Sequence, residues 1–208
     1  MPSLDHLIPF AIATLVFAAL PGPAILYAVA QTMARGRRGG LMATAGLSVG
    51  GLLHVAAAAA GLSAIFKYSP TLFLVMRVGG ALYLIWLGIQ MIRSKGETGL
   101  PAVTPRSTRR TFAQSVLVEV LNPKTALFFI AFLPQFVEAG VALPIWSQFL
   151  LLGLVVNLSF FASDLIAVLL TDRLLTRLKR NPRVVRAMRW TGGSVLVGLG
   201  AHMAISRN

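Results

Sequence analysis

Two helix-breaking motifs interrupt apolar segments that are long enough to cross a membrane. Pro21-Gly22-Pro23 lies near the middle of the run 7–33, and Asn122-Pro123-Lys124 lies near the middle of the run 112–137. Proline has no amide donor and leaves the carbonyl four residues earlier without its helical partner. In hydrocarbon, an unpaired backbone group costs several kcal/mol, so such breaks persist only where protein, water or a ligand satisfies them. Two broken spans in corresponding halves of a chain are typical of a transport site.

Composition places the whole chain in a membrane. Of its 208 residues, 56% are hydrophobic and only 12% are charged, about half the charge of a soluble domain. Several of its apolar stretches exceed the roughly 20 residues that a helix needs to cross a bilayer. The sequence therefore predicts an all-α polytopic membrane protein, with 1–208 forming one integral membrane domain. We expect six transmembrane helices, at about 7–33, 41–66, 72–92, 112–137, 145–170 and 188–205.

The placement of the basic residues predicts the orientation of the chain. Most of the 19 lysines and arginines lie after the first predicted span, between the third and fourth, or between the fifth and sixth. Excess Lys and Arg mark cytoplasmic loops, so both termini are expected outside. The net charge of +13 is then an orientation signal, with contact to anionic lipid at these loops. We expect no nucleic-acid partner.

The two halves of the chain carry matching residues. The helix 72–92 and the helix 188–205 share five identities at one constant offset. These are Arg77, Gly80, Leu87, Gly88 and Met91 in the first, and Arg189, Gly192, Leu199, Gly200 and Met203 in the second. Three helices per repeat is an odd number, so repeat two (about 112–208) is expected to be inverted relative to repeat one (about 1–93), with a cytoplasmic linker at about 94–111. Alternatively, these Gly and Pro residues serve only helix packing.

Each break predicts an anion site at the start of its second half-helix. Asn122 is a favoured N-cap residue, and a proline at the next position loses nothing by lacking an amide hydrogen. Gly22 and Pro23 take the same two positions in the first span. Free first-turn amides and the positive end of the helix dipole suit a carboxylate, and Lys124 adds a full charge. Alternatively, Lys124 is paired with a buried acid or with capping carbonyls and contributes only to folding.

Three other ionisable residues are candidates for ammonium binding or for carrying a coupling proton. The carbonyls that are freed before each break are the alternative partners for the ammonium group of the substrate. Glu119 and Asp164 are the two acids well inside predicted helices. Either acid could instead neutralise Lys124 or Arg77. His54 could relay protons because its pKa is ordinarily near neutrality, although a buried histidine bonded to a carbonyl is the alternative.

The sequence resembles the lysine exporter family in its homoserine/threonine efflux branch. The resemblance covers essentially the whole chain and is carried by Leu20-Pro21-Gly22-Pro23, Gly36-Arg37-Arg38-Gly39, Gly46 and Gly50, Gly80-Ala81-Leu82-Tyr83-Leu84 with Leu87-Gly88, Asn122-Pro123-Lys124, Phe128-Phe129 and Phe132-Leu133-Pro134-Gln135-Phe136. It implies a multi-pass protein of the bacterial inner membrane that exports amino acids or close derivatives in exchange for protons. It also implies that the residues of the two breaks line or shape the pathway. Ser115 and Glu119 depart from the family pattern.

We therefore expect a secondary active exporter of a small zwitterion, working by alternating access around a midplane site. Its substrate-binding residues are predicted to be Pro21, Gly22, Pro23, Asn122, Pro123 and Lys124. We expect no catalytic residues, metal site or cofactor, because the chain has no cysteine and its histidines, His6, His54 and His202, are widely separated. The sequence leaves open whether the protein forms a homo-oligomer.

Two other classes of function remain as alternatives. An inorganic or metal ion exporter on a related scaffold would need clustered acids or histidines, and Lys124 would repel a cation. A membrane enzyme would need a nucleophile and a base. Residues 46–50 spell GxSxG, but the nucleophile elbow requires a strand–turn–helix context, whereas this stretch is predicted to be apolar helix.

Overall fold

A computed structural model describes residues 4–93 and 108–171, together with 186–187, 190–191, 193–194, 197–198 and 201. Within this part of the chain every regular element is helical. The elements are α1 (Leu4–Ala19), α2 (Pro23–Ala57), η1 (Ala58–Leu62), α3 (Ser63–Tyr68), α4 (Pro70–Arg93), α5 (Thr108–Val120), α6 (Pro123–Leu127), η2 (Phe128–Phe132), η3 (Leu133–Phe136) and α7 (Ile145–Leu169). The residues of the second repeat that match helix 72–92, and most of the predicted sixth helix, lie outside the described residues.

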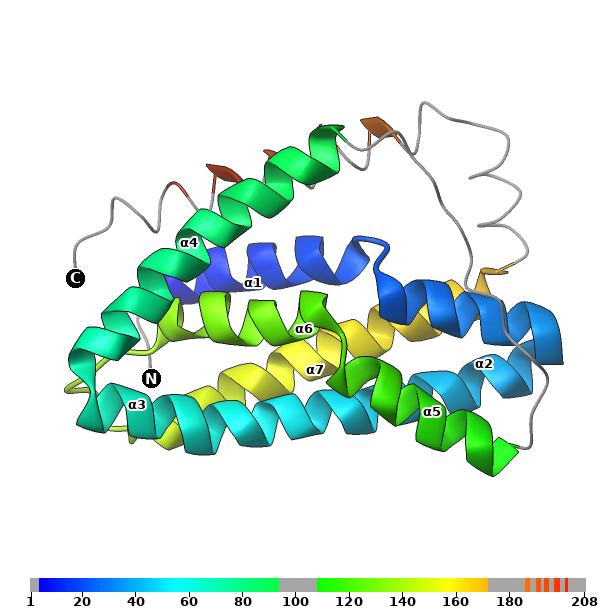
Figure 1. Ribbon diagram of the computed structural model, residues 1–208, viewed down its shortest axis with the longest axis horizontal. Coiled ribbons are helices and arrows are strands. Elements are labelled where there is room, and N and C mark those ends of the chain that lie inside the picture. Colours follow the sequence, from blue (N-terminus) through cyan, green and yellow to red (C-terminus); the bar gives the residue numbers. More distant parts are fainter. Residues whose placement is uncertain are drawn as a thin grey trace.

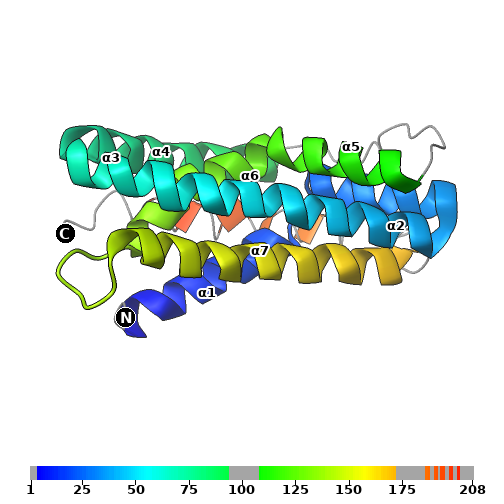
Figure 2. The ribbon, with the colours of Figure 1, turned by 90° about the horizontal axis from the view of Figure 1, so that it is seen from below.

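Helix α2 contains a reversal of chain direction. Gly36 has φ 68° and ψ −177° inside α2, a backbone conformation that glycine adopts without steric cost. Figures 1 and 2 show the darker first part and the lighter second part of α2 running in opposite directions on either side of this turn. The first part continues the span begun by α1, and the second part leads through η1 into α3. The loop expected after residue 33 is therefore only a tight turn.

The fourth predicted span is bent at its break. The segments Arg109–Val120 and Pro123–Phe136 meet at 41° and together are long and apolar enough to cross a membrane as one broken span. Beyond α6 the helix passes through a π-helical turn, η2, and a 3₁₀ turn, η3. Among the described residues, Pro23–Ile65 and Ile145–Leu169 also meet this length and hydropathy criterion.

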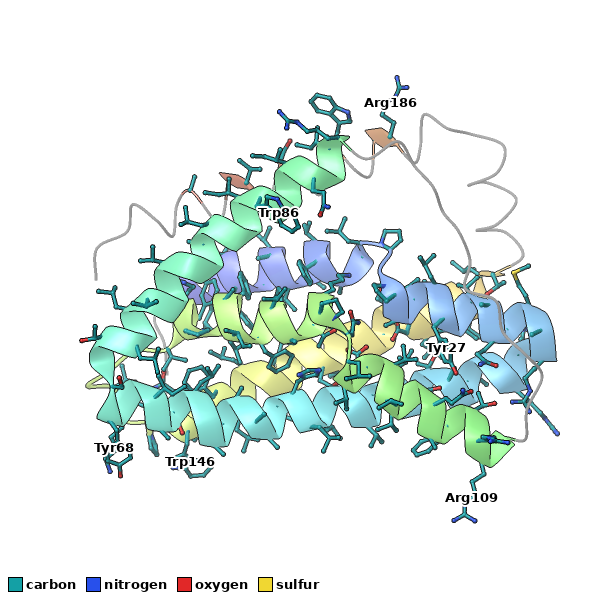
Figure 3. All side chains as sticks on the ribbon, in the orientation of Figure 1. Tyr27, Tyr68, Trp86, Arg109, Trp146 and Arg186 are labelled. Carbon is teal, nitrogen blue, oxygen red and sulfur yellow. The ribbon has the colours of Figure 1, made fainter. Side chains whose placement is uncertain are left out.

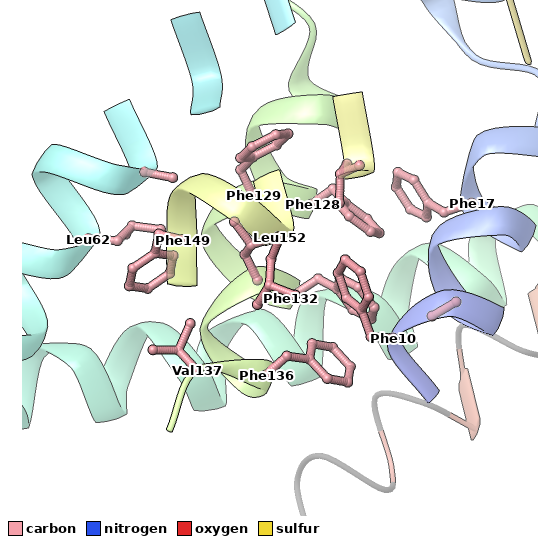
Figure 4. Packing of buried hydrophobic residues seen from close by; sticks show 14 of the residues in the cluster. Phe10, Phe17, Leu62, Phe128, Phe129, Phe132, Phe136, Val137, Phe149 and Leu152 are labelled. Carbon is pink, nitrogen blue, oxygen red and sulfur yellow. The ribbon is translucent and has the colours of Figure 1, made fainter. Parts of the chain in front are cut away.

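Aromatic side chains fix α1 against the segment that follows the second break. Phe17 lies 4.4 Å from Phe128 between ring centroids, and Phe10 lies 5.3 Å from Phe136. Figure 4 shows these rings packed between α1 and the α6–η3 segment, with Phe149 of α7 in the same cluster. Because the two segments are held together along this cluster, the two breaks are brought close to each other.

Glycines allow α2 to approach α5 closely. A Cβ atom on Gly46 would lie 2.6 Å from the main-chain oxygen of Phe112, and one on Gly50 would lie 2.8 Å from that of Val116. Real Cβ atoms do not approach backbone oxygens so closely, so any side chain would force the helices apart. Gly46 and Gly50, the small residues at the two ends of the GxSxG stretch, therefore serve helix packing.

The outer surface of the helices is apolar, as expected for contact with lipid. On α7, Leu151, Leu154, Val155 and Leu158 are all at least 40% exposed. Exposed Tyr68 and Trp146 lie at the end of the molecule opposite Arg109, as Figure 3 shows. Exposed Tyr and Trp residues near the ends of apolar helices, and basic residues gathered at one end, are typical of proteins that span a membrane. The Gly36 turn lies at the basic end, where Arg35 donates to the hydroxyl of Thr111.

Candidate functional site

The first break separates α1 from α2. α1 ends at Ala19, and Gly22 precedes α2 in an extended conformation, with Pro23 in the first turn. No side chain caps this N-terminus, so the amides of Ala24 and Ile25 have no acceptor within the helix. This arrangement of Gly22 and Pro23 confirms the positions predicted for them.

The second break separates α5 from α6 and differs from the first. Asn122 is the N-cap residue, as predicted, with Pro123 following it. Its Oδ1 atom accepts a hydrogen bond of 3.1 Å from the amide of Lys124. One first-turn amide of α6 is therefore already bound, whereas the N-terminus of α2 is open. The two half-helix ends are not chemically equivalent.

Lys124 joins the two breaks. Its Nζ atom donates to the main-chain oxygens of Phe17 at 2.9 Å and Leu20 at 2.7 Å, at the end of α1. The same atom lies 4.7 Å from the ring centroid of Phe17 and 5.8 Å from that of Phe160. Lys124 thus bonds to carbonyls at the first break and to neither carboxylate. Two of the three donors of its ammonium group are used in this way.

Two further side chains satisfy carbonyls at the breaks. The Ser163 hydroxyl donates to the carbonyl of Ala18 at 2.7 Å. The Nε2 atom of His54 lies 3.0 Å from the carbonyl oxygen of Glu119. Pro123 cannot donate to this carbonyl, which also accepts from the amide of Asn122 at 3.0 Å. The carbonyl-bonded alternative for His54 is therefore the contact that the structure contains.

Glu119 bridges the second break with both carboxylate oxygens. Its Oε2 atom accepts from Asn122 Nδ2 at 3.0 Å, and its Oε1 atom accepts from the Thr125 hydroxyl at 2.7 Å. The side chain is only 4% exposed. Because Asn122 is held by Glu119 through one end of its amide, the other end is oriented to cap α6. A buried carboxylate with two donors is the satisfied arrangement that burial requires.

A small cavity lies where the two breaks meet. Its volume is about 20 Å³, room for about one water molecule and not for an amino acid. Asp164, 5% exposed, reaches this cavity from α7. The lining residues are Ala18, Gly22, Ala24, Ile25, Glu119, Asn122, Lys124, Thr125, Phe160 and Asp164.

The structure brings most of the predicted site residues together. Five of them line this one cavity, namely Gly22, Glu119, Asn122, Lys124 and Asp164. Pro21, Pro23 and Pro123 lie at the two breaks and shape the backbone around it. His54 is not among the lining residues. Within the described ranges, no group of three or more His, Cys, Asp or Glu residues is placed to hold a metal ion.

Sequence reasoning missed four residues at the breaks. Thr125 and Ser163 provide hydroxyl donors, while Phe17 and Phe160 provide ring faces for the Lys124 ammonium. Thr125 could have been found as a polar residue in the first turn after the Asn122 cap. Ser163 adjoins Asp164. The two phenylalanines had no signal that distinguishes them from ordinary core residues.

Ser48, the central residue of the GxSxG stretch, lies inside α2. Its hydroxyl accepts a bond of 3.3 Å from Asn157 Nδ2 on α7. Ser48 therefore has no strand–turn–helix context and is not placed as a nucleophile. Its hydroxyl instead joins α2 to α7.

Comparison with known proteins gives a consistent result. The family model for LysE type translocators matches residues 15–207. The chain is 30% identical over 193 residues to the homoserine/homoserine lactone efflux protein of Salmonella typhimurium, covering 90% of each chain. It is 32% identical over 123 residues to the leucine efflux protein of Salmonella choleraesuis, covering 57% of each. An uncharacterized membrane protein of Vibrio cholerae is 28% identical over 199 residues, covering 95% of this chain and 96% of its own. No solved structure matches the chain.

Proposed function

Since the chain belongs to the LysE type translocator family, whose members move solutes and are not enzymes, we propose that it exports neutral amino acids or close derivatives across the bacterial inner membrane. The substrate class is supported by two relatives whose names specify homoserine, its lactone and leucine.

The observation that carries this proposal is the position of Lys124 between the two breaks, beside the cavity. Its ammonium group keeps a third donor after bonding to Phe17 and Leu20. The uncapped N-terminus of α2 presents the amides of Ala24 and Ile25 from the same lining. Together these groups form a recognition site for a carboxylate.

The coupling proton is assigned to the acid side of the site. Asp164 is the acid of the cavity whose carboxylate has no bond to Asn122 or Thr125, so it is the first candidate for carrying this proton. Glu119 already accepts from those two residues, and we assign it to holding the second break. His54 is assigned to the same structural task through the Glu119 carbonyl.

Transport then follows from the architecture that we propose. Six spans form two inverted three-helix repeats, with the basic loops in the cytoplasm and both termini outside. A cavity of about 20 Å³ cannot hold an amino acid, so the repeats must move apart on the cytoplasmic side to admit the substrate. They then rock to open outward. A proton moves inward in exchange.

Reconstitution in liposomes tests this function. Purified protein is exposed to an imposed pH gradient and a panel of labelled neutral, basic and acidic amino acids. Lys124→Ala and Asn122→Ala should each abolish transport while the protein still inserts. Lys67→Ala, at an exposed lysine of α3, is the matched control and should transport normally. Transport by Lys124→Ala at the wild-type rate would show that Lys124 does not bind the substrate carboxylate.

A further inference from the structure

The end of α1 presents a ready-made set of acceptors for a primary ammonium group. Two main-chain oxygens, of Phe17 and Leu20, lie 2.9 Å and 2.7 Å from one nitrogen atom. The ring centroids of Phe17 and Phe160 lie 4.7 Å and 5.8 Å from the same atom. We propose that this set is the binding site for the ammonium group of the substrate, and that Lys124 occupies it as a tethered ligand when no substrate is present.

The chemistry of the set favours an alkylammonium ion over other ligands. Carbonyls at the C-terminal end of a helix lack the usual donor four residues on and carry the negative end of the helix dipole; the Phe17 oxygen also accepts from the amide of Leu20 at 3.3 Å, and a carbonyl oxygen has two lone pairs. Aromatic ring faces attract a cation within about 6 Å. An ammonium ion offers several N–H donors around one charge, so it satisfies both carbonyls and faces both rings. An anion would be repelled by every group of the set.

The side chain of Lys124 reaches this set through a narrow passage. A Cβ atom on Gly22 would lie 2.7 Å from Lys124 Cδ and 3.2 Å from Nζ. The glycine at the first break therefore leaves room for the lysine stem. Since the remaining cavity is only about 20 Å³, a substrate ammonium can reach the carbonyls only after Lys124 has left them.

Replacement of the Lys124 ammonium by the substrate ammonium would make the site selective for zwitterions. This inference rests on the proposed function. The substrate carboxylate draws the Lys124 ammonium away, and the substrate ammonium takes its place on the carbonyls of Phe17 and Leu20. The Lys124 ammonium thus exchanges the two carbonyls for the substrate carboxylate, and the carbonyls exchange the Lys124 ammonium for that of the substrate. A compound with only one of the two groups completes only half of the exchange, so we expect amines without a carboxylate and acids without an amine to be poor substrates.

A rescue experiment tests the ammonium site directly. Lys124→Ala removes three carbons and the nitrogen, which together have the size of propylammonium. The midpoint of thermal unfolding is measured in detergent for the wild type, Lys124→Ala and Lys67→Ala, with and without propylammonium chloride. Propan-1-ol (no charge) and tetramethylammonium (no N–H donor) are the comparison solutes.

We expect propylammonium to raise the midpoint of Lys124→Ala alone, by about 3–6 °C at ten times its dissociation constant. The wild type has its site filled, and Lys67→Ala leaves the site intact, so neither should respond. No response of Lys124→Ala, an equal response of all three proteins, or an equal effect of propan-1-ol would each overturn the proposal.

A second variant covers the case in which Lys124→Ala does not fold. Lys124→Met keeps an unbranched apolar stem of similar length but offers no donor to the carbonyls of Phe17 and Leu20. It should unfold at a lower temperature than the wild type, and equal stability would overturn the ammonium site. The outcome is separable from the proposed function. If propylammonium stabilises Lys124→Ala but the wild type transports no amino acid, the ammonium site is supported and the exporter function is wrong. If the wild type transports amino acids, but propylammonium has no effect and Lys124→Met is as stable as the wild type, the exporter function is supported and the ammonium site is wrong.

Discussion

The Nζ atom of Lys124 donates to the main-chain oxygen of Leu20 at 2.7 Å. Lys124 belongs to the first turn of α6, and Leu20 is the residue at which the chain leaves α1. The bond therefore ties the beginning of one half-helix to the end of another across the two breaks. The positive end of α6 and the negative end of α1 meet at this point, and a zwitterion has the same two charges to offer.

Gly22→Ala should disturb this bond without removing any functional group. The new Cβ atom would lie 2.7 Å from Lys124 Cδ and 3.2 Å from Nζ, so the lysine stem must shift, and we expect this shift to weaken the bonds of its ammonium group to the carbonyls of α1. We expect the initial transport rate in liposomes to fall about tenfold or more, equivalent to roughly 1.4 kcal/mol. Gly61→Ala, with no atom within 4 Å of its Cβ position, is the control. A wild-type rate for Gly22→Ala would contradict the prediction.

Thr125→Val should weaken the second break by removing one of the two donors to Glu119. The Oε1 atom of this buried carboxylate then has no partner from Thr125. We expect a loss of about 1–3 kcal/mol, or a thermal midpoint lower by roughly 2–12 °C. Thr125→Ser keeps the hydroxyl and should remain near the wild type. Equal midpoints for the Val and Ser variants would show that the hydroxyl is dispensable.

Asp164→Asn should separate transport from the proton gradient. The carboxyl group is buried beside Lys124 in the cavity lining, and asparagine keeps its shape but cannot exchange a proton. We expect substrate exchange to continue at a rate that no longer depends on an imposed pH difference. His54→Gln is the comparison, because a glutamine amide can still donate to the Glu119 carbonyl and should preserve the dependence. Unchanged gradient dependence in Asp164→Asn would make Asp164 a structural residue.

Gly46→Ala should destabilise the contact between α2 and α5. Its Cβ atom would meet the backbone oxygen of Phe112 at 2.6 Å, and a backbone atom cannot swing aside as a side chain can. Overpacking of this kind costs about 1–3 kcal/mol, which thermal unfolding in detergent can measure. Gly79→Ala, with nothing within 4 Å, should instead be neutral or gain up to about 1 kcal/mol from helix propensity. Equal midpoints for the two variants would refute close packing at Gly46.

Several features of the fold follow from local chemistry and were predicted correctly. The interruption at Pro21-Gly22-Pro23, the Asn122 cap and the helix Ile145–Leu169 each depend on residues that are neighbours in the chain. Proline removes an amide donor, asparagine supplies an acceptor, and a long apolar run has no alternative to helix in lipid. The repeat and the sixth span stay predictions, because their residues lie largely outside the described part of the chain.

The support that holds the Asn122 cap in place was not predictable in this way. Both breaks begin a helix with proline, yet only α6 has its first-turn amide capped by a side chain. Asn122 caps α6 in an orientation that Glu119 and Thr125 fix. The sequence showed Glu119 as an acid without a defined role, and only its position across the break made it a structural support.

The sequence by itself determined that the chain is helical, where two of its helices break, and which charged residues lie at the breaks. The tertiary structure decided what Lys124 touches. From the sequence, a buried acid, a carbonyl and a substrate carboxylate were all possible partners. The choice was made by the aromatic packing of α1 against the segment after α6, which brings the carbonyls of Phe17 and Leu20 within hydrogen-bond distance of the ammonium group. The local sequence fixes which backbone groups a break leaves without a helical partner. Because a hydrogen bond acts over only about 3 Å, the packing of the helices decides which side chain comes close enough to bond to those backbone groups.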